Sequence, residues 1–326
     1  MAWAGAAKYT IYMIMLNKEF IVGELMKYVW VNGKLIPERE AVIPILTHAL
    51  HYGTSVFEGI RAYWSPESNN LYIFRARDHY IRFHNSAKIM GIKVGYGIDE
   101  LVDATVELLK ANEVRENVYI RPIAFVSAST VNLDIRDLET TTAIIAIPFG
   151  HYLEPKGVRA KVVSWLRVHN SMFPMKAKVG GIYVNSVIAL LDAKISGFDE
   201  AILLNRDGYV AEGSGENVFI VKDGVLYTPP TYDSILEGIT RDTVITIAKD
   251  LGLTVIEKRI TREELYTADE VFFTGTAAEV TPVVNIDGRV IGNGQPGPIT
   301  LKIRSYYMDL VHGKVSKYMS WLTPVY

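Results

Sequence analysis

Short runs that are apolar, or that alternate between apolar and polar residues, recur along this chain, and two-residue turn signals follow or separate these runs. The apolar run at residues 28–31 (YVWV) precedes one such signal, and the run at residues 219–221 (FIV) precedes another. Asn-Gly and Asp-Gly dipeptides accept positive φ angles at both central positions, which is the geometry of tight β-hairpins. We therefore predict hairpins in both halves of the chain, at Asn32-Gly33, Asp207-Gly208, Asp223-Gly224 and Asp287-Gly288.

Segments with helical periodicity lie between these strand-like runs. In these segments apolar residues recur every three to four positions, so that they fall on one face of a helix. Start and stop signals accompany the pattern, because Asp78 can cap one segment and Gly252 follows another. The pattern predicts helices over residues 78–90, 99–112, 185–195, 240–251 and 299–311.

A segment rich in proline and glycine divides the chain. Residues 148–157 (PFGHYLEPKG) lie between two β-prone runs, which is typical of a domain boundary. We predict a two-domain α+β fold, with residues 27–147 and 158–326 each forming mixed or antiparallel sheet with flanking helices. The cleft between the domains is the expected ligand site. Residues 1–26 form an N-terminal extension to which we assign no function.

The composition is that of a globular protein. The 326 residues are 49% hydrophobic and 21% charged, and the formal net charge is -2, which argues against a nucleic-acid surface. The apolar run at residues 9–16 is too short to span a bilayer and lacks the flanks of a secretory signal. There is no cysteine, so disulfides and thiolate chemistry are excluded. We expect a cytoplasmic protein that acts on small molecules, without nucleic-acid or membrane partners.

Two glycine-rich segments carry the main candidate chemistry. Lys178 begins KVGGIY, which ends at Tyr183, and Glu212 begins EGSGENVF. An amine for the aldehyde and a carboxylate for the ring nitrogen are the groups that a pyridoxal phosphate (PLP) enzyme supplies. The amine must lose its proton, and each unit by which its pKa falls costs about 1.4 kcal/mol, which burial or a nearby cation can supply. Taken alone, each of these residues has a purely structural explanation: Lys178 as a surface residue near a turn, Tyr183 as a core residue and Glu212 as a solvent-facing turn residue.

The sequence disfavours a nucleotide phosphate loop, a metal site and a serine-hydrolase site. The glycine spacing after Glu212 resembles a phosphate loop, but Glu212 and Glu216 would repel a polyphosphate, and the lysine of nucleotide motifs is missing. We interpret these glycines as positions where the backbone comes close to a cofactor. The seven histidines are scattered and the HExxH and GxSxG motifs are absent, so we expect neither a metal site nor a serine-hydrolase site.

Small residues at two turns predict a phosphate site. A phosphate is bound by an arginine, hydroxyls and backbone N–H groups, ideally at a helix N-terminus. Gly238-Ile239-Thr240 begins a predicted helix, and Gly275-Thr276 begins a turn of small residues. Arg77, at the start of the helix over residues 78–90, can supply the positive charge. Each feature alone is also explained as a helix cap, a turn or a surface arginine.

Aromatic residues and arginines predict a substrate pocket. Aromatic side chains form an apolar pocket, and an arginine beside a tyrosine can bind a carboxylate. The alternative is a sheet core with surface arginines. The candidates are Tyr52, Phe57, Gly59 and Arg61 within residues 51–63, and Tyr119 and Arg121 within residues 119–122.

Seven segments follow one another in order along the chain: HALHYGTSVFEGIRAY (48–63), FRARDH (74–79), YIRP (119–122), KVGGIY (178–183), EGSGENVF (212–219), LEGITRD (236–242) and FTGTAAEVTP (273–282). With these segments the chain resembles the class IV PLP-dependent aminotransferases of fold type IV, and among them the branched-chain amino acid aminotransferases. The resemblance runs from about residue 28 to the C-terminus.

The resemblance implies a role for each candidate toward the cofactor. Lys178 would be the Schiff-base and proton-transferring lysine, Glu212 would contact the pyridine nitrogen, and Tyr183 would contact the phenolic oxygen. The remaining cofactor-binding positions, most of them at the phosphate, would be Arg77, Leu236, Gly238, Ile239, Thr240, Gly275 and Thr276.

The resemblance also implies the substrate positions and a homodimer or a multiple of it. Tyr119 and the turn amides at Thr276 and Ala277 would bind the α-carboxylate, and Arg121 would bind the side-chain carboxylate of glutamate. Tyr52 would come from the neighbouring subunit. The other substrate positions would be Phe57, Gly59, Arg61, Tyr152, Tyr183 and Ala278.

The implied reaction is transamination of leucine, isoleucine and valine with 2-oxoglutarate. D-amino acid aminotransferase and aminodeoxychorismate lyase share the fold and are the alternatives; a non-catalytic PLP-binding protein is a more remote one. Where these enzymes often carry a glycine-rich interdomain loop, residues 127–132 read SASTVN. Because that loop helps to close the pocket, the substrate range stays open.

Overall fold

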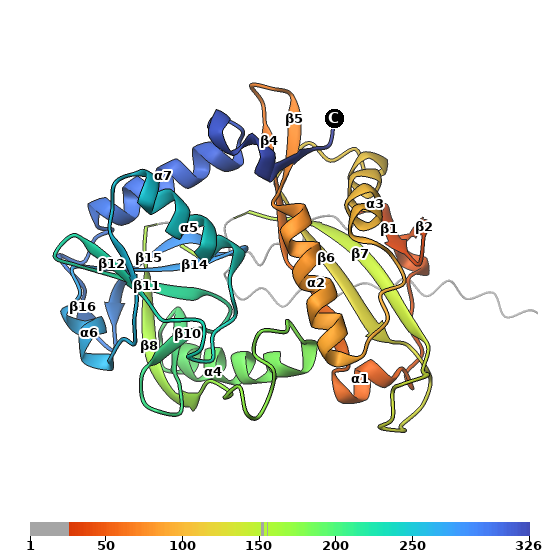
Figure 1. Cartoon of the computed structure of the whole chain (residues 1–326), viewed down its shortest axis with the longest axis horizontal. Helices are drawn as coiled ribbons and strands as arrows, with labels where there is room; N and C mark the ends of the chain where they lie inside the picture. Colours follow the sequence, from red (N-terminus) through yellow and green to blue (C-terminus); the bar gives the residue numbers. More distant parts are fainter. Residues whose placement is uncertain (1–25, 151–152, 155) are drawn as a thin grey trace, which may run out of the picture.

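The computed structural model describes residues 26–150, 153–154 and 156–326, which form two β-sheets with helices packed against them. Figure 1 shows two lobes side by side: most strands of the first half of the chain lie in one lobe, and those of the second half lie in the other. Within the described part of the chain, no helix is both long enough and apolar enough to cross a bilayer.

The first sheet has eight strands in the order β17-β5-β4-β6-β7-β1-β2, with β3 paired to β6, and all of its pairs are antiparallel. Burial alternates along β6, so one face meets the core while the other, with Tyr119 and Arg121, is half-buried. The strands are β1 (Tyr28–Val31), β2 (Lys34–Pro37), β3 (Ser55–Phe57), β4 (Ile60–Ser65), β5 (Asn70–Phe74), β6 (Val118–Val126), β7 (Thr140–Pro148) and β17 (Leu322–Pro324).

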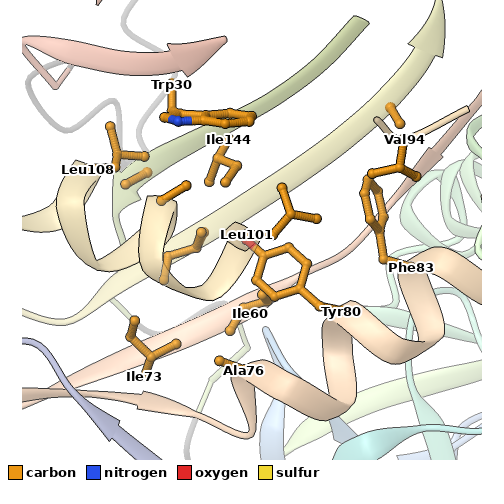
Figure 2. Close-up of a cluster of buried hydrophobic side chains, with 14 of the residues drawn as sticks. Trp30, Ile60, Ile73, Ala76, Tyr80, Phe83, Val94, Leu101, Leu108 and Ile144 are labelled. Carbon is orange, nitrogen blue, oxygen red and sulfur yellow. The ribbon is translucent and has the colours of Figure 1, made fainter. Parts of the chain in front are cut away.

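Helices α2 (Ala76–Met90) and α3 (Ile98–Ala111) belong to the core of this first lobe. Figure 2 shows Tyr80 and Phe83 of α2 in the same cluster as Leu101 and Leu108 of α3, and all four side chains are fully buried. Replacing such a leucine by alanine typically costs about 2–5 kcal/mol of stability. The short elements η1 (Glu38–Glu40) and α1 (His48–Tyr52) complete the lobe.

The second sheet has nine strands in the order β10-β9-β8-β15-β14-β11-β12-β13, with β16 beside β15. It is mixed, because β8 runs parallel to β9 and β15, and β12 runs parallel to β13. The strands are β8 (Val158–Leu166), β9 (Glu200–Leu204), β10 (Val210–Gly213), β11 (Asn217–Lys222), β12 (Val225–Thr228), β13 (Val255–Glu257), β14 (Glu270–Gly275), β15 (Glu279–Ile286) and β16 (Arg289–Val290).

The helices of the second lobe pack on this sheet, and one of them joins the two lobes. Tyr307 of α7 is buried in a cluster that contains Phe272 of the second sheet and Tyr63 of the first. The hydroxyl groups of Tyr63 and Tyr307 lie 3.3 Å apart. The elements are α4 (Tyr183–Ile195), α5 (Ile239–Asp250), α6 (Arg262–Thr267), α7 (Pro298–Val311), η2 (Gly180–Ile182) and η3 (Ser316–Trp321).

The predicted elements are confirmed with small shifts. All four turn dipeptides lie between neighbouring antiparallel strands, and all five predicted helices are present within two residues of the expected ends. At Asp207-Gly208 only the glycine has a positive φ, because this turn is longer and Asn205 N–H donates to Tyr209 O. The short helices α1 and α6 were not predicted, since a single turn carries little periodicity.

The sequence predicts that residues 158–326 form the second domain, but the end of the chain packs with the first. Strand β17 pairs with β5, so the last residues return to the first sheet. The expected linker at 148–157 lies between β7 and β8, and within it residues 151–152 and 155 are outside the described part.

Candidate functional site

A cavity of about 560 Å³ lies between the two sheets. Strands β3, β6 and β7 line it from the first lobe, and the segments around β10, β11 and β14 line it from the second. It brings together most of the residues predicted from the sequence. On the cofactor side these are Lys178, Tyr183, Glu212, Leu236, Gly238, Ile239, Thr240, Gly275 and Thr276; on the substrate side they are Phe57, Gly59, Tyr119, Arg121 and Ala277.

Lys178 lies just before η2 and α4, with its backbone held by the first lobe. Its N–H donates to Ser86 Oγ at 2.9 Å, and its carbonyl accepts from Phe57 N–H at 3.0 Å. Its Nζ donates to Tyr183 Oη at 2.5 Å and lies 4.9 Å from the centre of the Phe57 ring. The amine is therefore directed into the cavity beside a hydroxyl and an aromatic ring.

The paired glycines after Lys178 permit a close backbone contact. A Cβ atom on Gly180 would lie 2.2 Å from Ser55 Oγ, and a Cβ on Gly53 would lie 2.6 Å from Gly181 Cα. The two glycines let the lysine segment lie directly against residues 53–55, which fixes the position of the Lys178 backbone.

Glu212, on β10, is held in the second lobe by one ion pair and two hydrogen bonds. The Arg167 side chain forms the ion pair at 2.7 Å, and Asn217 Nδ2 and the Leu236 N–H donate to its Oε2 at 3.1 and 3.0 Å. Burial raises the pKa of Glu212, while Arg167, the Leu236 N–H and Lys178 oppose that rise. The ion pair and the two hydrogen bonds all favour the ionised form of the carboxyl group.

A second buried carboxyl group, Glu216, lies on the same side of the cavity. Its Oε2 accepts from Gly215 N–H at 3.1 Å. Burial and the neighbouring Glu200 raise the pKa of Glu216 well above its usual value. Glu212, with Arg167 beside it, and Glu216, with Glu200 beside it, thus differ in their tendency to ionise.

The part of the cavity at the N-terminus of α5 is suited to an anion. Gly238 is the N-cap of α5, and Ile239 and Thr240 form its first turn, where backbone N–H groups have no intrahelical partner. Thr276 lines the same cavity. A Cβ on Gly238 would lie 2.0 Å from Asn217 Oδ1, so a larger residue at this N-cap would displace the Asn217 side chain.

The arginine at this end is Arg82, not Arg77 as expected. Arg82 lines the cavity, and its Nη1 donates to Glu237 O at 2.8 Å, next to the N-cap of α5. Arg77 is largely exposed and pairs with Asp99 on the surface. Both belong to α2, but five residues turn a helix by about 140° beyond one full turn, so the two arginines leave it in different directions.

The substrate side of the cavity contains Phe57, Tyr119 and Arg121. Arg121 Nη2 donates to Tyr119 Oη at 2.9 Å, and the Arg121 guanidinium lies 4.5 Å from the centre of the Phe57 ring. A Cβ on Gly59 would lie 2.2 Å from Tyr119 Oη, so glycine makes room for this hydroxyl. The group offers a cation and a hydroxyl above an aromatic surface.

Four predicted substrate residues are not among the described residues that line the cavity. Arg61 is buried and pairs with Glu279 at 2.9 Å, and its Nη2 donates to the carbonyl of the cavity-lining Phe149, so its contact with substrate stays a prediction. Ala278 is buried behind the turn. Tyr52 is half-exposed, and its hydroxyl donates to Val131 O. Tyr152 lies outside the described residues.

Sequence reasoning missed Arg82, Arg167 and Asn217. Asn217 lies in a quoted segment and carried a signal, since an amide next to a carboxylate and a glycine turn is a natural hydrogen-bond donor. Nothing in the sequence marked Arg82 or Arg167 as site residues, because a single arginine on a helix or after a strand is usually a surface residue.

The fold and the site define an aminotransferase of class IV. Residues 55–286 match the family model described as amino-transferase class IV, and the chain belongs to this family. It is 52% identical to the probable branched-chain-amino-acid aminotransferase of Aquifex aeolicus over 303 residues, which are 92% of this chain and 97% of that protein. It is 44% identical to the branched-chain-amino-acid aminotransferase of Pseudomonas aeruginosa, over 91% of this chain and 97% of that protein.

Solved structures agree with these relatives. The branched-chain aminotransferase of Thermoproteus uzoniensis with norvaline matches with a TM-score of 0.89 and 57% identity, covering 92% of this chain and all of that one. The branched-chain amino acid aminotransferase of Thermobaculum terrenum in its PLP form matches with a TM-score of 0.89 and 40% identity, over 93% of this chain and all of that one. The expected family, fold and class of enzyme are therefore confirmed.

Proposed function

We propose that this chain is a PLP-dependent aminotransferase that transfers the amino group of L-leucine, L-isoleucine or L-valine to 2-oxoglutarate. The products are branched 2-oxo acids and L-glutamate. One observation carries the proposal: Lys178 and the Glu212–Arg167 pair line the same cavity as the N-terminus of α5. Similar proteins named branched-chain-amino-acid aminotransferases support the choice of substrates.

The residues that line the cavity fit PLP. Lys178 supplies the amine for the aldehyde, Glu212 the acceptor for the ring nitrogen and Tyr183 the hydroxyl for the phenolic oxygen. Arg82 and the first turn of α5 would hold the phosphate, in place of the Arg77 expected from the sequence. Thr274 Oγ1 is a buried polar atom at this cavity without a hydrogen-bond partner in the described part of the chain, as expected where a polar ligand binds.

PLP, when bound, supplies a carbonyl for the substrate amine and a protonated ring that accepts the electrons of the α-carbon. Lys178 Nζ would remove the α-proton and return it, and the Tyr183 hydroxyl at 2.5 Å keeps the amine in position. Arg167, at 2.7 Å from Glu212, keeps that carboxylate ionised, so that the ring nitrogen stays protonated. Because two half-reactions share one cavity, we expect ping-pong kinetics.

The apolar side chain of leucine and the carboxylate side chain of glutamate must bind in the same part of the cavity. The Arg121 guanidinium stacked on the Phe57 ring gives this volume an apolar surface and a cation. We propose that Arg121 binds the side-chain carboxylate of glutamate and that leucine packs on the aromatic surface. Tyr119 and the turn at Thr276 would bind the α-carboxylate of both.

We also propose that the chain acts as a homodimer, or as a larger assembly of dimers, in the cytoplasm. The segment around α1 exposes apolar side chains next to the exposed Val131 and Leu133, which favours a protein contact there. The exposed residues are Ile43, Ile45, Leu46, Leu50 and Tyr52. The assembly can be measured by light scattering, and a Leu46→Glu variant should shift it toward the monomer.

The test of function is a spectrophotometric titration of the purified protein with a panel of L- and D-amino acids. Conversion with L-leucine, L-isoleucine and L-valine, and return with 2-oxoglutarate, is the expected result. Lys178→Ala is the control, because it should lose covalent capture of the cofactor on borohydride treatment. Turnover of D-alanine without activity on branched L-amino acids would overturn the substrate assignment, and bound cofactor without any conversion would indicate a non-catalytic binder.

A further inference from the structure

Glu58 is a fully buried carboxylate between β3 and β4 that takes no part in the mechanism above. Its two oxygens accept from His79 Nδ1 at 2.7 Å, from Arg82 Nε and Nη2 at 2.7 and 2.8 Å, and from the Gly59 N–H at 3.3 Å. Burial alone would raise the pKa of Glu58, but Arg82 and His79 together lower it well below its usual value. Four donors around one buried carboxyl group hold it as an anion.

Arg82 is oriented by this carboxylate. A guanidinium has five N–H donors in a fixed plane. Three of them are used, two by Glu58 and one by Glu237 O. Glu237 directly precedes Gly238, the N-cap of α5, so the plane of Arg82 is fixed at the phosphate end of the cavity with two donors left for a ligand.

This set of contacts also connects the two lobes. Glu58 lies between two strands of the first sheet, Arg82 and His79 belong to α2, and Glu237 belongs to the segment before α5 in the second lobe. On α2, His79, Arg82 and Ser86 follow one another at spacings of three and four residues and so share one side of the helix. Ser86 binds the backbone of Lys178, so this one side of α2 contacts both ends of the site.

We propose that Glu58, supported by His79, is a positioning residue that holds Arg82 in the orientation needed to bind the phosphate of the cofactor. The proposal rests on the proposed function, since it assumes that PLP is the ligand. Glu58 acts through Arg82 and touches neither the substrate nor the reacting atoms. Its loss should weaken binding of the phosphate and leave recognition of the pyridine ring unchanged.

The test measures the affinity of the apoenzyme for PLP and for pyridoxal, which lacks the phosphate. Glu58→Gln should raise the Kd for PLP about tenfold, which corresponds to about 1.4 kcal/mol, because Arg82 loses the charged partner that orients it. The Kd for pyridoxal should stay unchanged. Arg77→Gln is the matched control, because it removes an arginine of the same helix that lies outside the cavity; it should change neither constant.

A double-mutant cycle separates positioning from a general structural role. If Glu58 acts through Arg82, then Glu58→Gln will not weaken PLP binding further once Arg82→Gln is present. A general effect on folding would raise the Kd by the same factor in both backgrounds and would also weaken pyridoxal binding. If Glu58→Gln does not fold, His79→Leu removes one donor to the same carboxylate and should raise the Kd for PLP alone.

The outcomes separate this inference from the proposed function. If the unaltered protein does not bind PLP, the proposed function fails. If it binds PLP but Glu58→Gln has the same Kd as the unaltered protein, or loses affinity for PLP and pyridoxal equally, only the positioning role of Glu58 fails.

Discussion

Arg167 is the residue whose replacement tests most directly how the carboxylate end of the site works. Its side chain pairs with Glu212 at 2.7 Å, and both side chains are only 5% exposed. Arg167→Met removes the charge, keeps an apolar chain of similar length and leaves Glu212 buried with Asn217 and the Leu236 N–H as remaining donors. We expect a higher pKa for Glu212, lower stability and slower turnover at neutral pH.

The expected rise in the pKa of Glu212 follows from Coulomb's law. Two unit charges about 4 Å apart interact by about 4 kcal/mol at an effective dielectric constant of about 20, which corresponds to about three pKa units. Breaking a buried ion pair from one side typically costs about 3–5 kcal/mol of stability. Because the proposed mechanism requires ionised Glu212, the acid limb of the kcat profile should move to higher pH in the variant.

The assay is kcat against pH, together with urea unfolding of the same protein. Arg61→Met is the matched control, since Arg61 is a similarly buried arginine that pairs with Glu279 and does not itself line the cavity. It should lose comparable stability without moving the acid limb. Arg167→Lys, which retains the charge, should keep the acid limb of the kcat profile closer to that of the unaltered protein. An unchanged acid limb in Arg167→Met would refute the role assigned to this ion pair.

Three further predictions concern groups around the cavity. Gly59→Ala should displace the Tyr119 hydroxyl, since the new Cβ would lie 2.2 Å from it; KM for L-leucine should rise about tenfold with little change in the unfolding midpoint. Gly180→Ala should cost about 1–3 kcal/mol in urea unfolding through its contact with Ser55 Oγ, and Ser55→Ala should relieve that cost. Glu216 has a raised pKa when folded, so its contribution to stability is lost as pH rises from near 4.5. Glu216→Gln should flatten that loss in unfolding curves at about pH 5 and about pH 8.

The sequence by itself determined the local structure and the identity of the chemical groups. Asn32-Gly33 specifies its hairpin because both residues adopt positive φ, and helix α3 follows from periodicity because its apolar side chains must share one face. Lys178 and Glu212 were identified by residue type in a glycine-rich context. Such features depend only on neighbouring residues, so a single sequence contains them.

Only the tertiary structure decided which residues meet across the chain. Strand β17 pairs with β5 more than 240 positions away, and no local pattern records that partner. Arg77 and Arg82 are arginines of the same helix, but the packing of α2 directs Arg82 to the cavity and Arg77 to Asp99 on the surface. Arg61 became an internal ion-pair partner for the same reason. The direction of a side chain and its charged neighbours are set by how whole elements pack, which requires the complete fold.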